Sequence, residues 1–486
     1  VYYRSRPLML ALGLTPEEAL AGTMGRAGGP SKGRDIGVVF NRPSTGGPTV
    51  LPMSGDVGTQ YTPATGWAQG ICYRRDVLRE EAWQGAIAVA TGGDGSVATN
   101  GFWSGLTIAT TLHLPMLFFI EDNNYAISVS SDLQTPGRDI GANLASFKNL
   151  LVLDGDGTDP LDAAANVTEA IGMLREGRGP VLLRLTVPRL PGHSGADNQA
   201  YKSVEEQDAE QARDPKSTLR ALLVPDHMSV EEWAALEREA RATVEAARDT
   251  VRAMPEPALS SAATCIFFEG ALQQQGGLAP EGALPEPGQE EKHVETPVRL
   301  NFIDAVRQTL AGEMRRNSRI LLFGEDVGRK GGVHGATRDL QSEFGEERVF
   351  DTSLSEEGII GRAAGMAIAG LLPVPEIQFR KYLDPATEQA NDIGTLRWRT
   401  ANRFAAPLVV RIPVGFSKRV GDPWHSVSDE AILAHKPGWR VAMPSNAEDA
   451  VGLLRTALRG NDPTFFLEHR NLLDTTEARR PYPGDD

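Results

Sequence analysis

The sequence predicts an α/β protein with two doubly wound, parallel-sheet domains joined by a helical and Pro/Gly/Glu-rich linker. Three observations predict this fold class. Apolar runs alternate with helical patterns in residues 1–227, the same alternation returns in residues 298–486, and residues 228–297 lack it. Buried strands separated by helices are typical of a parallel sheet that is covered on both faces. We therefore expect one domain on each side of the linker.

Short apolar runs mark the expected strands of the first domain. They are "GAIAVATGGDG", "PMLFFIEDNN", "LLVLDGDG" and "PVLLRLTVPRL". Between them lie Ala-rich stretches with a helical pattern, such as "DAAANVTEAIGMLREG".

The linker begins with a charged amphipathic helix, expected over residues 228–254. Ser229 is its expected N-cap, and Glu232 three residues later completes a capping box, in which each side chain satisfies a backbone N–H of the other residue. The stretch "QQQGGLAPEGALPEPGQEEKHVE" follows and has no apolar period. Its composition predicts a flexible or extended linker.

The second domain repeats the α/β layout without a residue-level repeat. Its expected strands are "RILLFGED", "LLPVPEIQF", "APLVVRIPVG", "WRVAMP" and "PTFFLEHR". Its expected helices include "NFIDAVRQTLAGEMRR" and "AEDAVGLLRTALRG".

The composition is that of a globular protein and excludes several function classes. Of the 486 residues, 41% are hydrophobic and 23% are charged, and a net charge of −15 argues against nucleic acid as the main partner. No apolar run approaches the roughly 20 residues that span a bilayer. Only Cys72 and Cys265 are present, which excludes a disulfide scaffold and a cysteine metal cluster and favours a reducing cytoplasm. The start without Met and the ending "RRPYPGDD" predict a chain truncated at both ends.

Polar side chains follow two of the expected strands. Gly93, Asp94 and Gly95 close one strand, and Asn123 closes another 29 residues after Asp94, which is the length of one helix and one strand. We therefore expect both polar side chains at the same edge of the sheet, where open α/β sheets bind ligands. Their oxygens suit Mg²⁺ with substrate phosphates, and Gly95 and Ser96 are expected to begin a helix that favours phosphate. Two unrelated tight turns are the alternative.

This pattern resembles the thiamine diphosphate motif. The surrounding "TTLHLPMLFFIEDNNYAIS" is similar to the α subunit of the decarboxylating component of 2-oxo acid dehydrogenase complexes, and most similar to the branched-chain type. The resemblance implies that Asp94, Asn123 and the backbone carbonyl of Tyr125 hold Mg²⁺. It also implies two thiamine-diphosphate-binding domains.

Three further segments extend the resemblance: "YYRS", "MSGDVGTQ" and "RLPGHS". The first implies diphosphate contacts from Tyr3 and Arg4, and the second places Ser54 and Val57 near the aminopyrimidine. In the third, Arg189 would pair with the diphosphate and His193 would donate or accept a proton. The cofactor-binding set from the first domain is Tyr3, Arg4, Ser54, Val57, Gly93, Asp94, Gly95, Ser96, Asn123 and Arg189.

The sequence departs from the family pattern in this domain. Gly192 stands beside His193 where related sequences often have a second His, and Glu121 stands where the branched-chain type often has Arg, which puts one diphosphate contact in question. The following "GADNQ" is poor in Ser and Thr, which argues against regulation by phosphorylation.

A glutamate motif carries the resemblance into the second domain. "TSLSEEGIIGRAAGMAIAG" is similar to the Leu-x-Glu-x-Gly segment of the β subunit, in which the Glu hydrogen-bonds a ring nitrogen of the cofactor's pyrimidine. Glu356 carries that position, and its role is to favour the imino form that activates the thiazolium carbon. Glu357 is expected to be an ordinary charge at a helix start.

Two segments of the second domain resemble the substrate side of the β subunit. "EIQFRKYLDPATEQ" implies that Phe379 and Tyr382 line the cofactor and acyl pocket. "GDPWHSVSDEAILAHKPG" implies that His425 is a catalytic histidine near the 2-oxo acid or the lipoyl group. His435 and His334 are expected to be structural.

The resemblance implies an α subunit and a β subunit fused in one chain, with the cofactor between the two domains and the family's C-terminal transketolase-type domain absent. The implied reaction is oxidative decarboxylation of a 2-oxo acid, branched-chain in preference to pyruvate, with transfer of the acyl unit to a lipoyl group. The implied partner is a lipoylated dihydrolipoyl acyltransferase, and the implied protein is a homodimeric, cytoplasmic, bacterial 3-methyl-2-oxobutanoate dehydrogenase.

Three alternatives stay open. A pyruvate or acetoin dehydrogenase component would share every motif. A transketolase-type carbon transferase would share the Asp-Asn and Glu motifs but would need a sugar-phosphate pocket. An inert scaffold or binding protein would have lost Glu356, Asp94 or Asn123, and all three are present.

Overall fold

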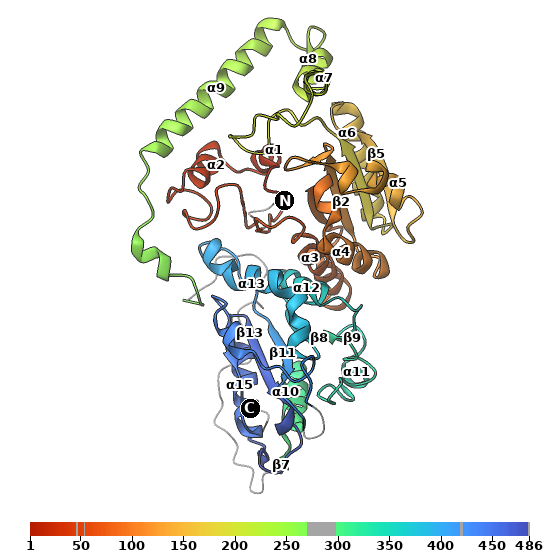
Figure 1. The fold of residues 1–486 in the computed structure, drawn as a ribbon, viewed down its shortest axis with the longest axis vertical. Coiled ribbons are helices and arrows are strands. Elements are labelled where there is room, and N and C mark those ends of the chain that lie inside the picture. The colour runs from red at the N-terminus through yellow and green to blue at the C-terminus, as the bar shows by residue number, and fades with distance from the viewer. Residues whose placement is uncertain (45–46, 53, 270–297, 418–420, 485–486) are drawn as a thin grey trace. The chain divides into compact units, whose positions relative to one another are not determined.

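A computed structural model describes residues 1–44, 47–52, 54–269, 298–417 and 421–484. The chain forms two compact units, one of Val1–Ala68 with Gln84–Leu259 and one of Gln69–Trp83 with Ser260–Asp486 (Figure 1). Most of the predicted linker, residues 270–297, lies outside the described residues. None of the helices in the described ranges is long and apolar enough to cross a membrane.

The first unit is built on a parallel sheet with the strand order β1-β2-β6-β5. Its strands are β1 (Ala88–Gly93), β2 (Met116–Asp122), β5 (Leu151–Asp156) and β6 (Val181–Thr186), with a small hairpin of β3 (Tyr125–Ala126) and β4 (Val129–Ser130). Its helices are α1 (Arg6–Ala11), α2 (Pro16–Thr23), α3 (Tyr61–Cys72, which continues into the second unit), α4 (Asn100–Thr111), α5 (Ile140–Leu144), α6 (Pro160–Arg175), α7 (Val204–Ala212), α8 (Pro215–Leu223) and α9 (Val230–Arg252).

Helices cover both faces of this sheet. Successive side chains of a strand point to opposite faces, and here both sets are apolar and pack against helices. On one face, Leu117 of β2 packs with Leu174 of α6 in an apolar cluster. On the other face, the ring of Phe118 lies 5.9 Å from Tyr61 of α3 and 5.8 Å from Phe102 of α4. The doubly wound arrangement predicted for this half is confirmed.

The second unit contains a six-stranded parallel sheet with the order β12-β13-β11-β10-β8-β9. Its strands are β8 (Ile320–Gly324), β9 (Val349–Asp351), β10 (Leu372–Glu376), β11 (Val409–Val414), β12 (Arg440–Ala442) and β13 (Thr464–His469), with β7 (Arg299–Leu300) and β14 (Arg480–Pro481) as a separate pair. Its helices are α10 (Phe302–Arg316), α11 (Leu340–Phe344), α12 (Glu356–Ile368), α13 (Thr387–Arg399), α14 (Glu430–Ala434) and α15 (Ala447–Arg459).

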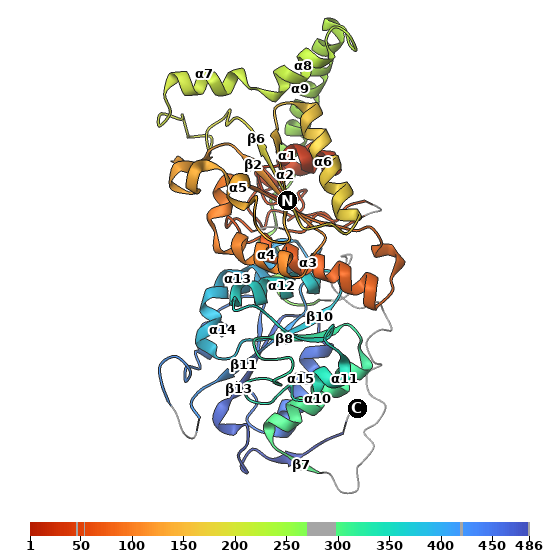
Figure 2. The same ribbon diagram turned by 90° about the vertical axis from the view of Figure 1, so that its right-hand side faces the viewer.

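The second sheet is also covered on both faces. Leu322 of β8 packs with Leu310 of α10 and Leu454 of α15, and these two helices lie side by side (Figure 2). The next side chain, Phe323, points to the opposite face, where the guanidinium of Arg362 from α12 lies 5.1 Å from its ring. Each unit therefore presents the carboxyl ends of parallel strands along one edge.

The strands and helices predicted from sequence are present, and some details differ. The amphipathic helix is α9, and Ser229 and Glu232 form the predicted capping box. β9 was not predicted, because only three residues form it. Gly95 and Ser96 do not begin an α-helix: they lie in a 3-10 turn, and α4 begins five residues later, at Asn100, because Gly and Ser are poor helix formers.

Candidate active site

The ends of β1 and β2 bring Asp94 and Asn123 together. The strands are parallel neighbours in which Gly93 lies opposite Glu121, and Asp94 and Asn123 each directly follow their strand. The backbone N–H of Asn123 donates to Oδ1 of Asp94 at 3.3 Å. The edge of the sheet thus carries an acidic side chain and an amide next to each other.

Asp94 is a buried carboxylate with one unused oxygen. It is 3% exposed, and its Oδ2 has no hydrogen-bond partner among the described residues. Burial, and then the charge of Asp122, raise the pKa of Asp94 to about 6. A buried carboxylate without a compensating charge is unfavourable. A cation at Oδ2 would remove that cost.

The turn after β2 supplies the other expected donors. Oδ1 of Asn123 accepts the N–H of Tyr125 at 3.1 Å, and Asn124 has a left-handed φ of 65°, which Asn tolerates better than most residues. The described residues contain no group of three or more His, Cys, Asp or Glu side chains that could hold a metal ion. One carboxylate, one amide and one backbone carbonyl are hard oxygen donors that fit Mg²⁺ completed by phosphate and water.

Small residues let the chain turn tightly at Asp94. A Cβ on Gly95 would collide with the side chain of Ala126. The buried hydroxyl of Ser96 donates to the carbonyl of Gly93 at 2.6 Å and hydrogen-bonds the hydroxyl of Tyr61 at 2.6 Å. Ser96 therefore stabilises the turn that carries Asp94.

Two arginines and a histidine come together in the first unit. Nη2 of Arg4 lies 2.9 Å from Nδ1 of His193. Burial and the charges of Arg4 and Arg189 lower the pKa of His193 and so favour its neutral form. Arg189 is buried and lies 3.9 Å from Asp197, and its charge also acts on Asp94. This clustering of cations suits a phosphate ligand.

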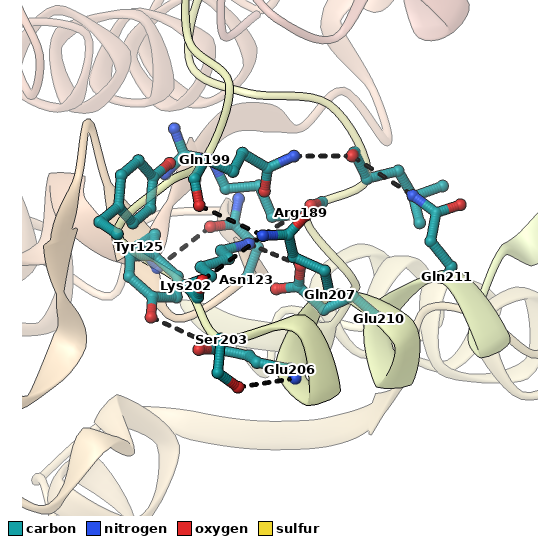
Figure 3. A network of polar contacts seen from close by, with 12 residues as sticks. Asn123, Tyr125, Arg189, Gln199, Lys202, Ser203, Glu206, Gln207, Glu210 and Gln211 are labelled. Carbon is teal, nitrogen blue, oxygen red and sulfur yellow. Dashed lines mark hydrogen bonds and ion pairs between the residues drawn. The ribbon is translucent and has the colours of Figure 1, made fainter.

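Helix α7 joins the segment after Arg189 to the turn after β2 (Figure 3). The fully buried Lys202 side chain pairs with Glu210 of α7 at 2.5 Å, and its Nζ lies 4.7 Å from the ring centroid of Tyr125. The hydroxyl of Tyr125 donates to Glu206 of α7 at 2.8 Å. Burial, then Glu206, raises the pKa of Tyr125 to about 12.

A second row of side chains on the same face of α7 binds the loop of residues 190–199, which follows Arg189. Gln207 donates to the carbonyl of Gln199 at 3.3 Å, and Gln211 donates to the carbonyl of Leu190 at 3.5 Å. Gln199 also donates to Leu190, at 2.9 Å. Residues four apart share a helix face, so α7 contacts both the loop and Tyr125 along one side.

Ser54 and Val57 lie on a different turn of the first unit. Ser54 is buried, whereas Val57 is 41% exposed. The side chain of Gln60 donates to the carbonyl of Thr91 at 3.1 Å and so ties this turn to β1.

The N-terminal segment contacts the end of β2. The guanidinium of Arg4 lies 5.3 Å from the ring centroid of Tyr3, and the hydroxyl of Ser5 donates to Glu121 at 3.1 Å. Burial raises the pKa of Glu121. The carboxyl of Glu121 is thus held by a hydroxyl.

In the second unit, Glu356 begins α12 and faces a second carboxylate. Ser355 caps the helix through the N–H of Gly358 at 3.2 Å. Glu325 directly follows β8, and its Oε1 is buried without a partner in the described ranges. Burial, then the charges of Glu356 and Asp326, raise the pKa of Glu325 to about 7. Sequence reasoning missed Glu325, although it follows a strand just as Asp94 does.

The residue after Glu356 differs from its expected role. Glu357 is half-buried, and burial raises its pKa, so it is not an ordinary exposed helix-start charge. The physical reason is that α12 is apolar and buried from Gly358 onward, so the first turn of the helix, which contains Glu357, is partly buried as well.

His425, Tyr382 and Phe379 form one cluster. Nε2 of His425 lies 3.0 Å from the hydroxyl of Tyr382, and the His425 and Phe379 rings are 4.6 Å apart. Arg470, which directly follows β13, donates to the carbonyl of His425 at 2.6 Å and stacks 5.0 Å from the Phe379 ring centroid. Sequence reasoning missed Arg470 and also Asp422, whose carboxylate lies 2.9 Å from Nδ1 of His425.

The two histidines expected to be structural have different surroundings. His334 lies 5.9 Å from the Phe379 ring, and burial, then Arg470 and Arg411, lower its pKa to about 4. Its Nε2 is buried with no partner in the described part of the chain. His435 is exposed at the end of α14.

A buried ion triad links three strands below this edge. Arg411 of β11 pairs with Glu376 of β10 at 2.7 Å and with Glu468 of β13 at 2.7 Å, and all three are at most 2% exposed. No sequence signal separated these residues from the apolar strands around them.

Comparison with known families agrees with this arrangement. The family model described as "Dehydrogenase E1 component" matches residues 1–260. The model described as "Transketolase, pyrimidine binding domain" matches residues 299–476.

Relatives match the second half of the chain. The 2-oxoisovalerate dehydrogenase subunit beta of Bacillus subtilis (strain 168) is 45% identical over 188 residues, which are 38% of this chain and 57% of the relative. The pyruvate dehydrogenase E1 component subunit beta of the same organism is 41% identical over 174 residues, or 36% of this chain and 53% of the relative. The chain thus spans little more than half the length of either relative.

A solved transketolase from Campylobacter jejuni has a similar fold. Its TM-score is 0.56 at 15% identity, over 87% of this chain and 62% of that chain. The predicted fusion of an α-like half with a β-like half is confirmed by the two successive family matches. Because the first model covers more than half of the residues, the chain belongs to the dehydrogenase E1 component family.

Proposed function

We propose that this chain catalyses the oxidative decarboxylation of a 2-oxo acid with thiamine diphosphate and Mg²⁺. The observation that carries the proposal is the unused Oδ2 of the buried Asp94 beside Asn123. Buried carboxylates with a raised pKa cluster at functional sites. Family membership and the match of residues 299–476 to the pyrimidine-binding domain support it.

The first unit would hold the metal and the diphosphate end of the cofactor. Asp94, Asn123 and the carbonyl of Tyr125 are the proposed Mg²⁺ donors. Arg4 and Arg189 would bind diphosphate oxygens. Burial and the charges of these two arginines lower the pKa of His193, and its ring would accept or donate a proton at a nitrogen. Tyr3, Ser54, Val57, Gly93, Gly95 and Ser96 complete the proposed set.

The second unit would hold the pyrimidine end. Glu356 would hold a proton against a pyrimidine nitrogen, and Phe379 and Tyr382 would line the acyl pocket. His425 would face the 2-oxo acid. When bound, thiamine diphosphate supplies a nucleophilic carbon and an electron sink for the electrons left by CO₂.

The proposed substrate is a branched-chain 2-oxo acid. The β-subunit relatives include both a 2-oxoisovalerate and a pyruvate enzyme, and the former has the higher identity of the two. Because one methylene changes specificity by only about 1–3 kcal/mol, the choice depends on pocket details. The acyl acceptor is proposed to be the lipoyl group of a dihydrolipoyl acyltransferase, and the homodimer and the cytoplasmic location stay predictions.

Turnover with an artificial electron acceptor tests this proposal. The protein is given Mg²⁺ and thiamine diphosphate, with 3-methyl-2-oxobutanoate or pyruvate in parallel assays. We expect turnover that needs both cofactors and a higher kcat/KM for the branched acid. A preference for pyruvate would contradict the proposed substrate, and the absence of turnover with either acid would contradict the proposed reaction.

A further inference from the structure

The carboxylate of Asp422 contacts both the backbone and the ring of His425. Its Oδ1 accepts the backbone N–H of Trp424 at 2.9 Å and that of His425 at 3.0 Å, and it lies 2.9 Å from the ring Nδ1 of His425. Ser426 fixes the backbone of Asp422, because its hydroxyl accepts the N–H of Asp422 at 2.9 Å and its own N–H donates to the Asp422 carbonyl at 3.0 Å. The acid is thus locked in place relative to the ring.

The hydrogen bonds of Asp422 determine where the imidazole carries its proton. Slight burial acts to raise the pKa of Asp422, but the N–H groups of Trp424 and His425 lower it, and the net shift is downward. An ionised carboxylate can only accept hydrogen bonds, so Nδ1 must carry a proton. In a neutral ring, Nε2 then has no proton and accepts the hydroxyl of Tyr382 at 3.0 Å.

An aromatic neighbour and a backbone hydrogen bond also hold the ring. Phe379 meets the imidazole edge-to-face, at an interplanar angle of 77°. Arg470 donates to the His425 carbonyl and holds the main chain. Both ring nitrogens therefore have partners and the ring packs against Phe379, so it has little freedom to turn.

We propose that Asp422 is a positioning residue that fixes His425 in the Nδ1–H tautomer, with the unprotonated Nε2 turned toward the hydroxyl of Tyr382. A base that is oriented by a third group is the arrangement found where an imidazole must accept a proton at one defined atom. The inference deepens the proposed function and rests on it, because His425 faces the 2-oxo acid only in that function. Tyr382 then has two roles: it lines the pocket, and its hydroxyl donates a hydrogen bond to His425.

Nitrogen NMR of the histidine rings tests the tautomer without any need for activity. The protein, which has eight His, is labelled with ¹⁵N in the imidazoles, and His425→Gln assigns the His425 signals. At pH 8 we expect Nδ1 of His425 to be protonated and Nε2 to be unprotonated. Asp422→Ala should mix the tautomers, whereas Tyr382→Phe should keep the Nδ1–H form. Protonated Nε2 in the unchanged protein, or no change in Asp422→Ala, would overturn the proposal.

Two further variants separate positioning from folding. Asp422→Asn keeps an oxygen that can accept the backbone N–H groups and the Nδ1 proton, so it should fold and largely retain the tautomer. Glu430→Gln removes an exposed carboxylate from the same segment and should leave the His425 spectrum unchanged. A spectrum that changes equally in Glu430→Gln and Asp422→Ala would overturn a specific role for Asp422.

The kinetic effect distinguishes this proposal from the function on which it rests. In a turnover assay, Asp422→Ala should lower kcat by roughly 10²-fold, with KM within about threefold and Asp422→Asn in between. A lost tautomer with unchanged kcat would overturn the positioning role in the reaction. If the unchanged protein turns over no 2-oxo acid, the proposed function fails, and the NMR result alone decides whether Asp422 sets the tautomer.

Discussion

The two units pair their buried carboxylates differently at the same kind of edge. In each, a parallel sheet with helices on both faces ends in short loops at the carboxyl ends of its strands. In the first unit, the buried Asp94 lies where the charge of Arg189 reaches it, and the equally buried Asp122 beside it is paired with Arg184 at 2.7 Å. In the second unit, Glu325 and Glu356 repel each other, and the buried Arg411 is already paired with two other acids.

The same sheet architecture thus carries different polar side chains at its edge in the two units, and the loops after the strands supply that difference. A cation-rich edge with a single unused carboxylate oxygen suits a metal and a diphosphate. An edge with two interacting carboxylates suits a neutral ring whose nitrogen needs a proton held nearby. Four variants test this difference between the units, and the one with the largest expected effect comes first.

Glu356→Gln should break the acid-rich edge. The amide cannot hold an exchangeable proton as a carboxyl group does, so kcat should fall about 10³-fold. Cofactor affinity should fall by less than about tenfold, because the first unit keeps its donors. Steady-state turnover and a cofactor titration measure the two effects, with Glu430→Gln as the exposed control. Full activity in Glu356→Gln would contradict the assigned role.

Lys202→Met should loosen the cation-rich edge. It leaves Glu210 without its buried partner, which should cost about 3 kcal/mol of stability. Hydrogen exchange should rise in residues 189–203, and Lys202→Met combined with Glu210→Gln should recover most of the loss. The matched control is Lys216→Met, which removes the exposed ion pair with Glu237 and should cost less than about 1 kcal/mol in urea denaturation. Equal losses in the two single variants would show that burial of the pair has no effect.

Asp94→Asn should stabilise the protein while it removes the metal site. The folded pKa of about 6 exceeds the unfolded value of roughly 3.9, so the wild-type protein loses stability as pH rises through this window. At pH 8 without Mg²⁺ the variant should be about 2 kcal/mol more stable by urea denaturation, and below pH 4 the difference should vanish. Asp208→Asn, an exposed control, should change stability by a few tenths of a kcal/mol. A less stable Asp94→Asn at pH 8 would contradict the uncompensated carboxylate.

Glu325→Gln should also stabilise the protein, by less than Asp94→Asn does. Its folded pKa of about 7 lies above the unfolded value of roughly 4.3, so stability falls as pH rises between these values. Solvent reaches this carboxylate, so the discounted gain at pH 8 is about 1 kcal/mol. Thermal denaturation from pH 4 to pH 8 measures it. A gain that is independent of pH would exclude the ionisation of Glu325 as its cause.

The fold was predictable because local patterns and tertiary structure agree. Two apolar runs end at Gly93 and at Asp122, and turn residues bound each of them. One helix separates the runs, so the sequence predicted that they pair as parallel strands. The capping box at Ser229 was readable because it needs only two residues at a fixed spacing. The 3-10 turn at Gly95 was missed because the weak helix propensity of Gly and Ser was given too little weight.

The candidate site was predictable only where a residue stands in a motif. Asp94, Asn123 and Glu356 were predicted from spacing and resemblance, and the structure brings Asp94 and Asn123 together. Glu325 and Asp422 were missed, because their roles arise from burial beside Glu356 and from a turn that folds back on His425. The α7 contacts to Tyr125 join segments about 80 residues apart, and the sequence alone gives no sign of such pairing.

Binding of thiamine diphosphate to the protein, followed by isothermal titration calorimetry with and without Mg²⁺, tests the central claim most directly. We predict one cofactor bound per chain, a strong dependence on Mg²⁺, and an affinity at least about 100-fold weaker in Asp94→Asn than in Asp208→Asn. Binding that is indifferent to Mg²⁺ and unchanged in Asp94→Asn would contradict the account.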